Sequence, residues 1–190
     1  MRRIVSLVAT LGLLATLPLH AQRANTRAGF WWAFGFGAAQ GRLVCEICAD
    51  ESHLDLSGTV RLGETLSPHW LLGGEATGWT NRGGGIISRR ALSATIVALY
   101  YPWPKDAFYL KGGAGVAVYR AVDTVDAITA TRPALELGAG YEWRIGPMFS
   151  INPYLNYVRG IPGQLRFDGE PIADDAGVSY LQFGIGLVLH

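Results

Sequence analysis

Two cysteines, Cys45 and Cys48, form the first group in the sequence that could carry chemistry. A Cys-x-x-Cys pair serves redox chemistry in a βαβ context, and it contributes to a zinc site when a second pair of ligands lies nearby. His53 lies close, but three ligands do not complete a structural zinc site. We therefore expect a disulfide between Cys45 and Cys48, formed in an oxidising compartment, with metal binding or redox chemistry as the alternative. No cofactor is expected.

A second group, His53, Asp55 and Ser57, contains the residue types of a hydrolase triad. Alternate residues of a strand share one face, but their side chains stand about 6.5–7 Å apart, which is too far for a direct hydrogen bond. Of the remaining histidines of the mature chain, His69 falls at the predicted periplasmic end and His190 at the terminus. The sequence therefore predicts a protein that is not an enzyme.

A third group consists of charged and amide side chains that recur at alternate positions of otherwise apolar or Gly-rich segments. Its members are Asp55, Arg61, Glu75, Lys111, Glu136, Glu142, Asn152, Asn156 and Gln182. In a narrow lumen such charges are expected to pair, because an unpaired buried charge costs several kcal/mol. We expect an ion-pair and hydrogen-bond network that plugs the lumen of a small barrel, and the alternative is the lining of a narrow, porin-like pore.

These side chains can share one face only if they lie on β-strands, in which polar and apolar residues alternate with a period of two. The sequence predicts eight strands, at 29–40, 54–64, 69–80, 90–101, 107–119, 133–144, 149–159 and 178–189. Each has about the length that a tilted strand needs to cross a bilayer. Short Pro-bearing connections at 65–68, 102–105 and 145–148 alternate with longer ones at 41–53, 81–89, 120–132 and 160–177.

The two faces of each strand differ in kind. In 54–64, for example, Leu54, Leu56, Val60 and Leu62 share one face, and the opposite face is polar. The polar faces carry few charges and many glycines, which suits a cramped lumen better than a solvated surface. Aromatic residues gather at the strand ends, as in the belts of membrane barrels. Those beside the short turns are Trp31, Trp32, Trp70, Tyr100, Tyr101, Trp103, Phe108, Tyr109, Tyr141, Trp143 and Phe149, and those toward the long loops are Trp79, Tyr119, Tyr157 and Tyr180.

The chain is therefore expected to be all-β, an eight-stranded antiparallel transmembrane β-barrel with short periplasmic turns and longer outer loops. Residues 1–21 have the basic start, apolar stretch and small final residue of a secretory signal peptide, which leaves 22–190 as the outer-membrane β-barrel domain. The net charge of +1, which falls when the signal is removed, excludes a basic surface for nucleic acid. Basic residues near 82–90 are expected either to be solvated or to meet lipopolysaccharide phosphates.

The last strand, Ser179 to His190, carries the most specific resemblance to a known family. It is similar to the closing strand of small OmpA/OmpX-type outer-membrane β-barrels, in which a polar-x-Gly-x-x-apolar-x-apolar pattern is read by the barrel assembly machinery. Gln182, Gly184, Leu187 and Leu189 match this pattern, whereas His190 stands where the family usually has an aromatic residue.

This resemblance implies the outer membrane of a Gram-negative type envelope as the location. It also implies a structural, adhesive or surface-interaction role, with outer-membrane lipids, lipopolysaccharide and the barrel assembly machinery as partners. A narrow solute or ion pore and a lipid A-modifying enzyme are the alternatives on the same fold.

Overall fold

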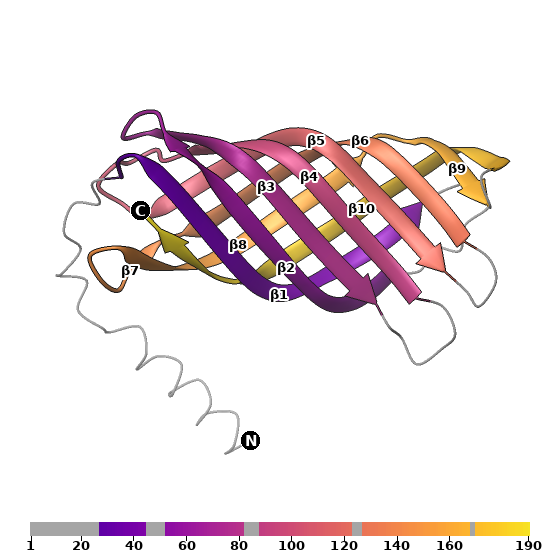
Figure 1. The fold of residues 1–190 in the computed structure, drawn as a ribbon, viewed down its shortest axis with the longest axis horizontal. Helices are drawn as coiled ribbons and strands as arrows, with labels where there is room; N and C mark the ends of the chain where they lie inside the picture. Colours follow the sequence, from indigo (N-terminus) through magenta and orange to yellow (C-terminus); the bar gives the residue numbers. More distant parts are fainter. Residues whose placement is uncertain (1–26, 45–51, 82–87, 123–126, 168–169) are drawn as a thin grey trace, which may run out of the picture.

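The computed structural model describes residues 27–44, 52–81, 88–122, 127–167 and 170–190, all joined in one antiparallel sheet (Figure 1). The strands are β1 (Phe30–Val44), β2 (Ser52–Thr65), β3 (Trp70–Asn81), β4 (Ser88–Tyr100), β5 (Phe108–Val122), β6 (Ala127–Tyr141), β7 (Trp143–Arg144), β8 (Phe149–Gly160), β9 (Gly163–Phe167) and β10 (Glu170–Leu189). Among these residues there is no helix that is long and apolar enough to cross a membrane. The expected signal peptide lies outside the described residues.

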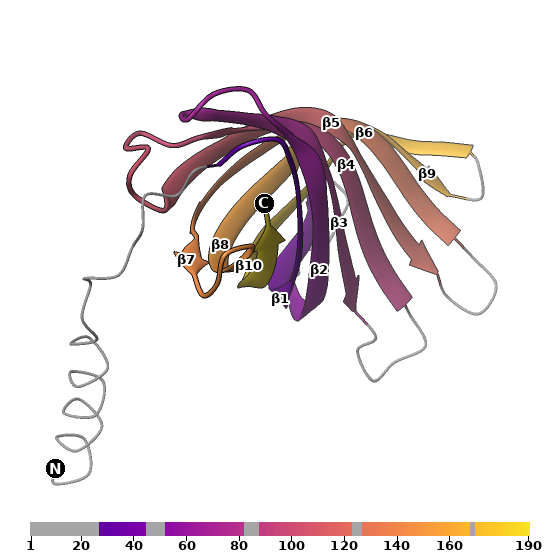
Figure 2. The same ribbon diagram turned by 60° about the vertical axis from the view of Figure 1, so that its left-hand side comes forward.

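Eight of these strands close into a barrel. They follow one another as β1, β2, β3, β4, β5, β6, β8 and β10, and the pairing of β10 with β1 completes the circle (Figure 2). Closure matters because every strand then has a hydrogen-bonding neighbour on both sides, as lipid requires. The expected eight-stranded antiparallel barrel is confirmed.

The short connections all lie at one end of the barrel, together with the C-terminus, and we call this the turn end (Figure 1). The 65–68 connection, for example, is held by a hydrogen bond from Leu66 N to Trp70 O of 2.9 Å. The opposite end, which carries the longer connections, is the loop end. Several strands continue further toward the loop end than predicted, because the alternation of side chains persists past the apolar stretch.

The expected long loop at 160–177 is largely strand. β9 pairs with the first part of β10 and also touches β6, so a hairpin extends the wall at the loop end (Figure 1). The ladder between β9 and β10 is irregular, with register shifts between Pro171 and Ala173 and between Ala173 and Ala176. The irregular ladder and the polar composition of this segment explain why its period of two is hard to see in the sequence.

The predicted strand 133–144 is interrupted at Glu142, which separates β6 from β7. The Glu142 amide donates a hydrogen bond of 2.9 Å to Ala107 O, which continues the register that pairs Tyr141 with Phe108. Its side chain is buried in the barrel, as its place in the alternation predicts, and it meets partners described below. The interruption is therefore local, and the inward alternation continues through it.

The alternation of exposed and buried side chains follows the predicted faces. Phe36, Leu56 and Ile96 on the outer wall are 72%, 71% and 69% exposed, whereas inward residues such as Thr77 are fully buried. On β1 the outward residues are apolar from Phe30 to Ala38, which is about 26 Å along the strand and about 20 Å of depth at a usual tilt, and the polar Gln40 and Arg42 follow. This is close to the height of about 25 Å of the apolar band of outer-membrane barrels.

Six aromatic residues placed in the predicted belts point into the lumen instead. Trp31, Tyr101 and Tyr109 pack at the turn end, and Trp79, Tyr119 and Tyr180 pack at the loop end, all of them buried. Each of the six lies an even number of residues from other lumen-facing residues of the strand that contains or adjoins it. The alternation of side chains along each strand therefore predicts that they face inward. The belt is correspondingly thinner than expected, and the lumen has an aromatic layer at each end.

Several glycines sit where two strands of the wall come unusually close. A Cβ added at Gly63 of β2 would overlap the carbonyl oxygen of Leu72 on β3. Gly63 is paired there with Gly73, so neither strand has a side chain at this point. Glycine is required at such positions because the neighbouring backbone occupies the space of a side chain.

Candidate functional site

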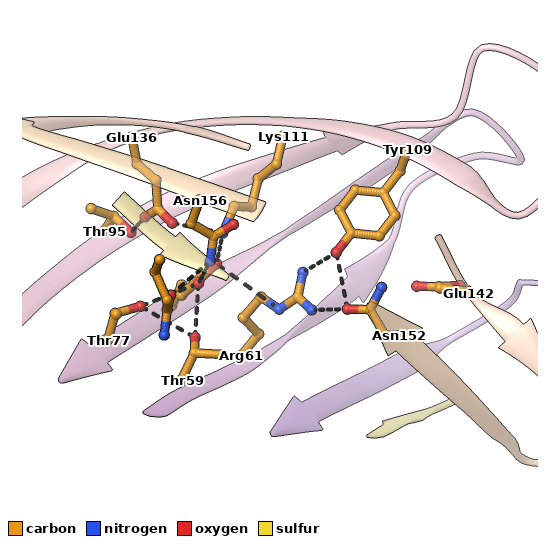
Figure 3. Close-up of polar contacts among 12 residues, drawn as sticks. Thr59, Arg61, Thr77, Thr95, Tyr109, Lys111, Glu136, Glu142, Asn152 and Asn156 are labelled. Carbon is orange, nitrogen blue, oxygen red and sulfur yellow. Dashed lines mark hydrogen bonds and ion pairs between the residues drawn. The ribbon is translucent and has the colours of Figure 1, made fainter. Parts of the chain in front are cut away.

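A chain of buried charges crosses the lumen (Figure 3). Lys111 of β5 lies between two carboxylates, Glu75 of β3 and Glu136 of β6, and its side chain is fully buried. The Lys111 Nζ donates to Glu136 Oε1 at 2.6 Å and also to Glu75 Oε2. The three side chains start from different strands, so together they join separate parts of the wall. With Arg61 they form what we call the central charge network.

Both carboxylates have partners besides Lys111. Glu75 Oε1 accepts hydrogen bonds from Thr59 Oγ1 at 2.8 Å and from Asn156 Nδ2 at 3.3 Å. Glu136 Oε2 accepts a hydrogen bond from Thr95 Oγ1 at 2.6 Å. All the carboxylate oxygens of the pair are therefore engaged. A carboxylate satisfied in this way is poorly suited to take up or release a proton during a reaction.

Arg61 of β2 extends the network toward the turn end. It donates to Tyr109 Oη at 3.0 Å and to Asn152 Oδ1 at 2.6 Å, and its Nε lies 3.9 Å from Glu75 Oε2. Tyr109 Oη in turn donates to Asn152 Oδ1 at 3.0 Å. The two cations and two carboxylates of the central charge network sum to zero charge, which allows them to remain ionised together away from water.

On the remaining side of the lumen, amide and hydroxyl side chains form hydrogen bonds with one another. Asn156 Nδ2 donates to Gln182 Oε1 at 3.0 Å, and Gln182 Nε2 donates to Ser57 Oγ at 3.2 Å. These residues come from β8, β10 and β2. Polar side chains therefore link β2, β3, β4, β5, β6, β8 and β10 through the lumen, and an eight-stranded barrel leaves little other space there.

The structure places two of the predicted charged lumen residues outside the central charge network. Asp55 lies nearer the loop end, where its Oδ2 accepts a hydrogen bond of 3.0 Å from Asn81 Nδ2. Glu142 lies at the turn end, well apart from Lys111 and Glu136 (Figure 3). The parity of a residue in its strand shows that it faces the lumen, but it does not show the depth at which its side chain finds a partner.

Glu142 belongs to what we call the turn-end cluster, with Arg27, Tyr101 and His190. Tyr101 Oη donates to Glu142 Oε1 at 2.7 Å, while Arg27 Nε and His190 Nε2 lie 3.5 Å and 3.3 Å from Glu142 Oε2. Arg27 precedes β1 and stacks over the Tyr101 ring at 3.6 Å, and its Nη2 donates to Asp106 O at 2.9 Å. The cluster thus ties the segment before the first strand to the end of the last strand.

The environment of Glu142 favours its charged form. Burial raises the pKa of this carboxyl, but the hydrogen bond and charge of His190, the charge of Arg27 and the Tyr101 hydroxyl together hold the pKa below its usual range. Because the pKa is lower in the folded state, the ionised carboxylate stabilises the fold above the unfolded-state pKa. This contribution is lost as the pH falls through the folded-state pKa.

We therefore expect Glu142→Gln to lower the free energy of unfolding by about 1.5–3 kcal/mol at about pH 7. The difference from the wild type should shrink as the pH falls through the folded-state pKa, where the wild-type carboxylate also becomes neutral. Denaturant unfolding of the protein in lipid vesicles over a descending pH series measures both quantities. Glu64→Gln, on an exposed carboxylate near the same end, is the matched control and should change little. A difference that stays constant with pH would contradict this assignment.

The histidines do not assemble a hydrolase site in the part of the chain that the structure describes. The His69 ring Nδ1 is 2.8 Å from Tyr101 O, and the His190 ring contacts Glu142. Ser57, the serine predicted to share a strand face with His53, accepts a hydrogen bond from Gln182. Among the described residues no group of three or more histidine, cysteine, aspartate and glutamate side chains could hold a metal ion.

The structure describes some, but not all, of the remaining predicted site residues. Cys45 and Cys48 lie outside the described residues, so the disulfide stays a prediction. Of the C-terminal pattern, Gln182 is buried in the lumen, and Leu187 and Leu189 are half-buried on the outer wall. Gly184 lies where an added Cβ would overlap the carbonyl oxygen of Phe36. The reading of this pattern by an assembly machinery also stays a prediction.

No protein-family model and no curated protein match the sequence. Solved structures do match the fold. Neisserial surface protein A is 15% identical, with a TM-score of 0.60 over 85% of this chain and 97% of its own. Ail, the attachment invasion locus protein of Yersinia pestis, is 16% identical, with a TM-score of 0.55 over 86% of this chain and 99% of its own. At this identity the likeness concerns the fold alone, and it confirms the resemblance to the small OmpA/OmpX-type outer-membrane barrels.

Proposed function

We propose that the chain is a sealed, non-catalytic barrel of the outer membrane that acts through its outer wall and its loop end. The observation that carries this proposal is the bridge that Lys111 makes between Glu75 and Glu136 across the lumen. A pore needs a continuous path of water, and side chains bonded to one another across the middle of a narrow barrel obstruct such a path. Function is then left to the surfaces that face lipid and the medium.

Two further observations support this role. The outer wall carries an apolar band of the depth expected for a bilayer, which supports insertion into the outer membrane after export. The two structural neighbours described above are, by their names, a surface protein and an attachment invasion protein. Their names agree with a surface-interaction role, whereas the saturated carboxylates of the lumen offer no group poised for catalysis.

Planar-bilayer recording tests the proposal directly. We expect the wild-type protein to give no steady unitary conductance steps, because the central charge network fills the lumen. Glu75→Ala/Lys111→Ala/Glu136→Ala shortens all three bridging side chains, and small ion-conducting steps are expected from it. Steady unitary steps from the wild type would overturn the sealed-barrel proposal in favour of the narrow pore.

A further inference from the structure

Two arginines flank a serine on the outer wall at the loop end. Arg42 of β1 is the register partner of Ser179 of β10, and Ser179 is in turn the partner of Arg159 of β8. Both arginines are exposed, whereas Ser179 between them is buried. The arginine Cα atoms are two strand spacings apart, about 9–10 Å, so the long side chains can converge over the serine. We call Arg42, Ser179 and Arg159 the arginine row.

From this row toward the turn end, the outward side chains of the same three strands change stepwise from polar to apolar. The next outward positions are Gln40, Leu181 and Tyr157, which form a mixed row. The two rows that follow toward the turn end contain only apolar side chains. They are Ala38, Phe183 and Leu155, and then Phe36, Ile185 and Pro153. The wall therefore passes from cationic to apolar within a few residues.

Hollows accompany this gradient. Two small hollows of about 320 and 130 Å³ lie along the arginine row, both lined by Arg42, Tyr157 and Ser179. Further toward the turn end the wall has a larger apolar groove of about 680 Å³. Its lining residues include the small side chains Ala38, Ala139 and Pro153 and the large side chains Phe36, Phe183 and Ile185. The groove is a shallow channel in the part of the wall that faces hydrocarbon.

The distances fit one leaflet of a membrane. From Ser179 to Ile185 the strand advances about 20 Å, which is about 15 Å of depth at a tilt of about 40°. The hydrocarbon core of a bilayer is about 30 Å thick, so its half-thickness is about 15 Å. A lipid whose phosphate meets the arginine row would therefore have its acyl chains alongside the groove.

We infer that this wall binds one molecule of a phosphorylated, acylated lipid, with a phosphate on the arginine row and an acyl chain in the groove. Guanidinium groups suit phosphate because they offer paired, charge-assisted hydrogen bonds, and the Ser179 hydroxyl supplies a further donor between them. The inference rests on the membrane location in the proposed function, but it does not depend on whether the lumen is sealed. In the proposed orientation the loop end faces the outside, where lipopolysaccharide carries phosphates on its lipid A.

A second outward arginine pair provides a matched comparison. Arg90 of β4 and Arg120 of β5 are register partners, are exposed and lie at the same end of the barrel. They do not line the hollows or the groove described above. Replacing either pair with glutamine removes the same charge from the same end. The two double variants therefore separate a built site from general attraction between a basic rim and an anionic surface.

Native mass spectrometry of the full-length protein in detergent tests the inference, with bisphosphorylated lipid A as the probe. We expect the wild type to retain one lipid A, and Arg42→Gln/Arg159→Gln to bind it at least about tenfold more weakly. Arg90→Gln/Arg120→Gln should bind as the wild type does. Ala38→Phe, which fills part of the groove and leaves the arginines in place, should also weaken binding.

Equal affinity of both double variants, or equal affinity of the wild type for lipid A stripped of its phosphates, would overturn the inference. Unchanged binding by Ala38→Phe would overturn the placement of the acyl chain. Faster migration of unheated than of heated samples on detergent gels shows that each variant is folded, so that lost binding reports on the site. The outcome is independent of the conductance test: a conducting wild type that binds lipid A at the arginine row would refute only the sealed lumen.

Discussion

Replacing Lys111 with methionine is expected to lower the free energy of unfolding by about 3–5 kcal/mol. The substitution keeps a long side chain but removes the one cation that both Glu75 and Glu136 contact at hydrogen-bond distance. Two fully buried carboxylates would then face each other without it, and a buried carboxylate that loses its counter-charge is strongly destabilising. Denaturant unfolding of the refolded protein in lipid vesicles measures the loss.

Two further variants give this experiment its controls. Lys105→Met makes the same substitution at an exposed turn position and should change the free energy of unfolding by no more than about 0.5 kcal/mol. Glu75→Gln/Lys111→Met/Glu136→Gln removes the carboxylates together with the ammonium group, so most of the stability should return. If Lys111→Met were no less stable than Lys105→Met, the buried charges would not hold the strands together.

A single methyl group added at Gly63 is expected to have an effect of similar size. The Cβ of Gly63→Ala would overlap the carbonyl oxygen of Leu72 and come close to the backbone of Gly73, so two hydrogen-bonded strands would have to move apart. Overpacking of this kind costs about 1–3 kcal/mol, and the upper end applies because backbone rather than a flexible side chain must shift. We therefore expect a loss of about 3 kcal/mol, or failure to fold.

Gly74→Ala is the matched control for this prediction. Gly74 lies beside Gly73 on β3, and a Cβ built there meets nothing within 4 Å. Replacing this glycine should be neutral or stabilising by about 0.4–1 kcal/mol, since the unfolded chain loses conformational freedom. Gel mobility with and without heating, followed by denaturant unfolding, compares the two variants. Equal behaviour of Gly63→Ala and Gly74→Ala would show that the β2–β3 approach can relax.

The sequence was sufficient to predict the barrel because the period of two determines which side chains face lipid. Leu54, Leu56 and Val60 alternate with Ser57 and Thr59, and this pattern survives any error in the exact strand ends. The eight outward faces and the alternation of short and long connections then leave few other architectures. The failure to predict β9 has a particular cause, because the ladder that β9 forms with β10 is irregular.

The partners within the lumen could not be predicted to the same degree. Which side chain lies opposite Lys111 depends on the stagger of strands that are distant in the sequence, and the pattern within one strand carries no information about that stagger. The aromatic residues show a related limit. Tyr101 and Tyr109 lie at strand ends, which predicts a place in the belt, but both are buried and alternate in step with lumen residues such as Lys111. For an aromatic residue at a strand end, the face on which it lies therefore predicts its surroundings better than its position along the strand.

The seam between β1 and β10 has a consequence for how the chain folds. Trp32 and Leu189 are register partners although they lie near opposite ends of the polypeptide, so the barrel closes through contacts of the highest sequence separation that it contains. Loop closure of this kind is slow, and contacts between neighbouring strands form without it. Until β10 arrives, β1 and β8 each present an open row of amide and carbonyl groups, which hydrocarbon cannot satisfy. We therefore expect stable residence in a bilayer to require β10, so a fragment that lacks this strand should not remain inserted.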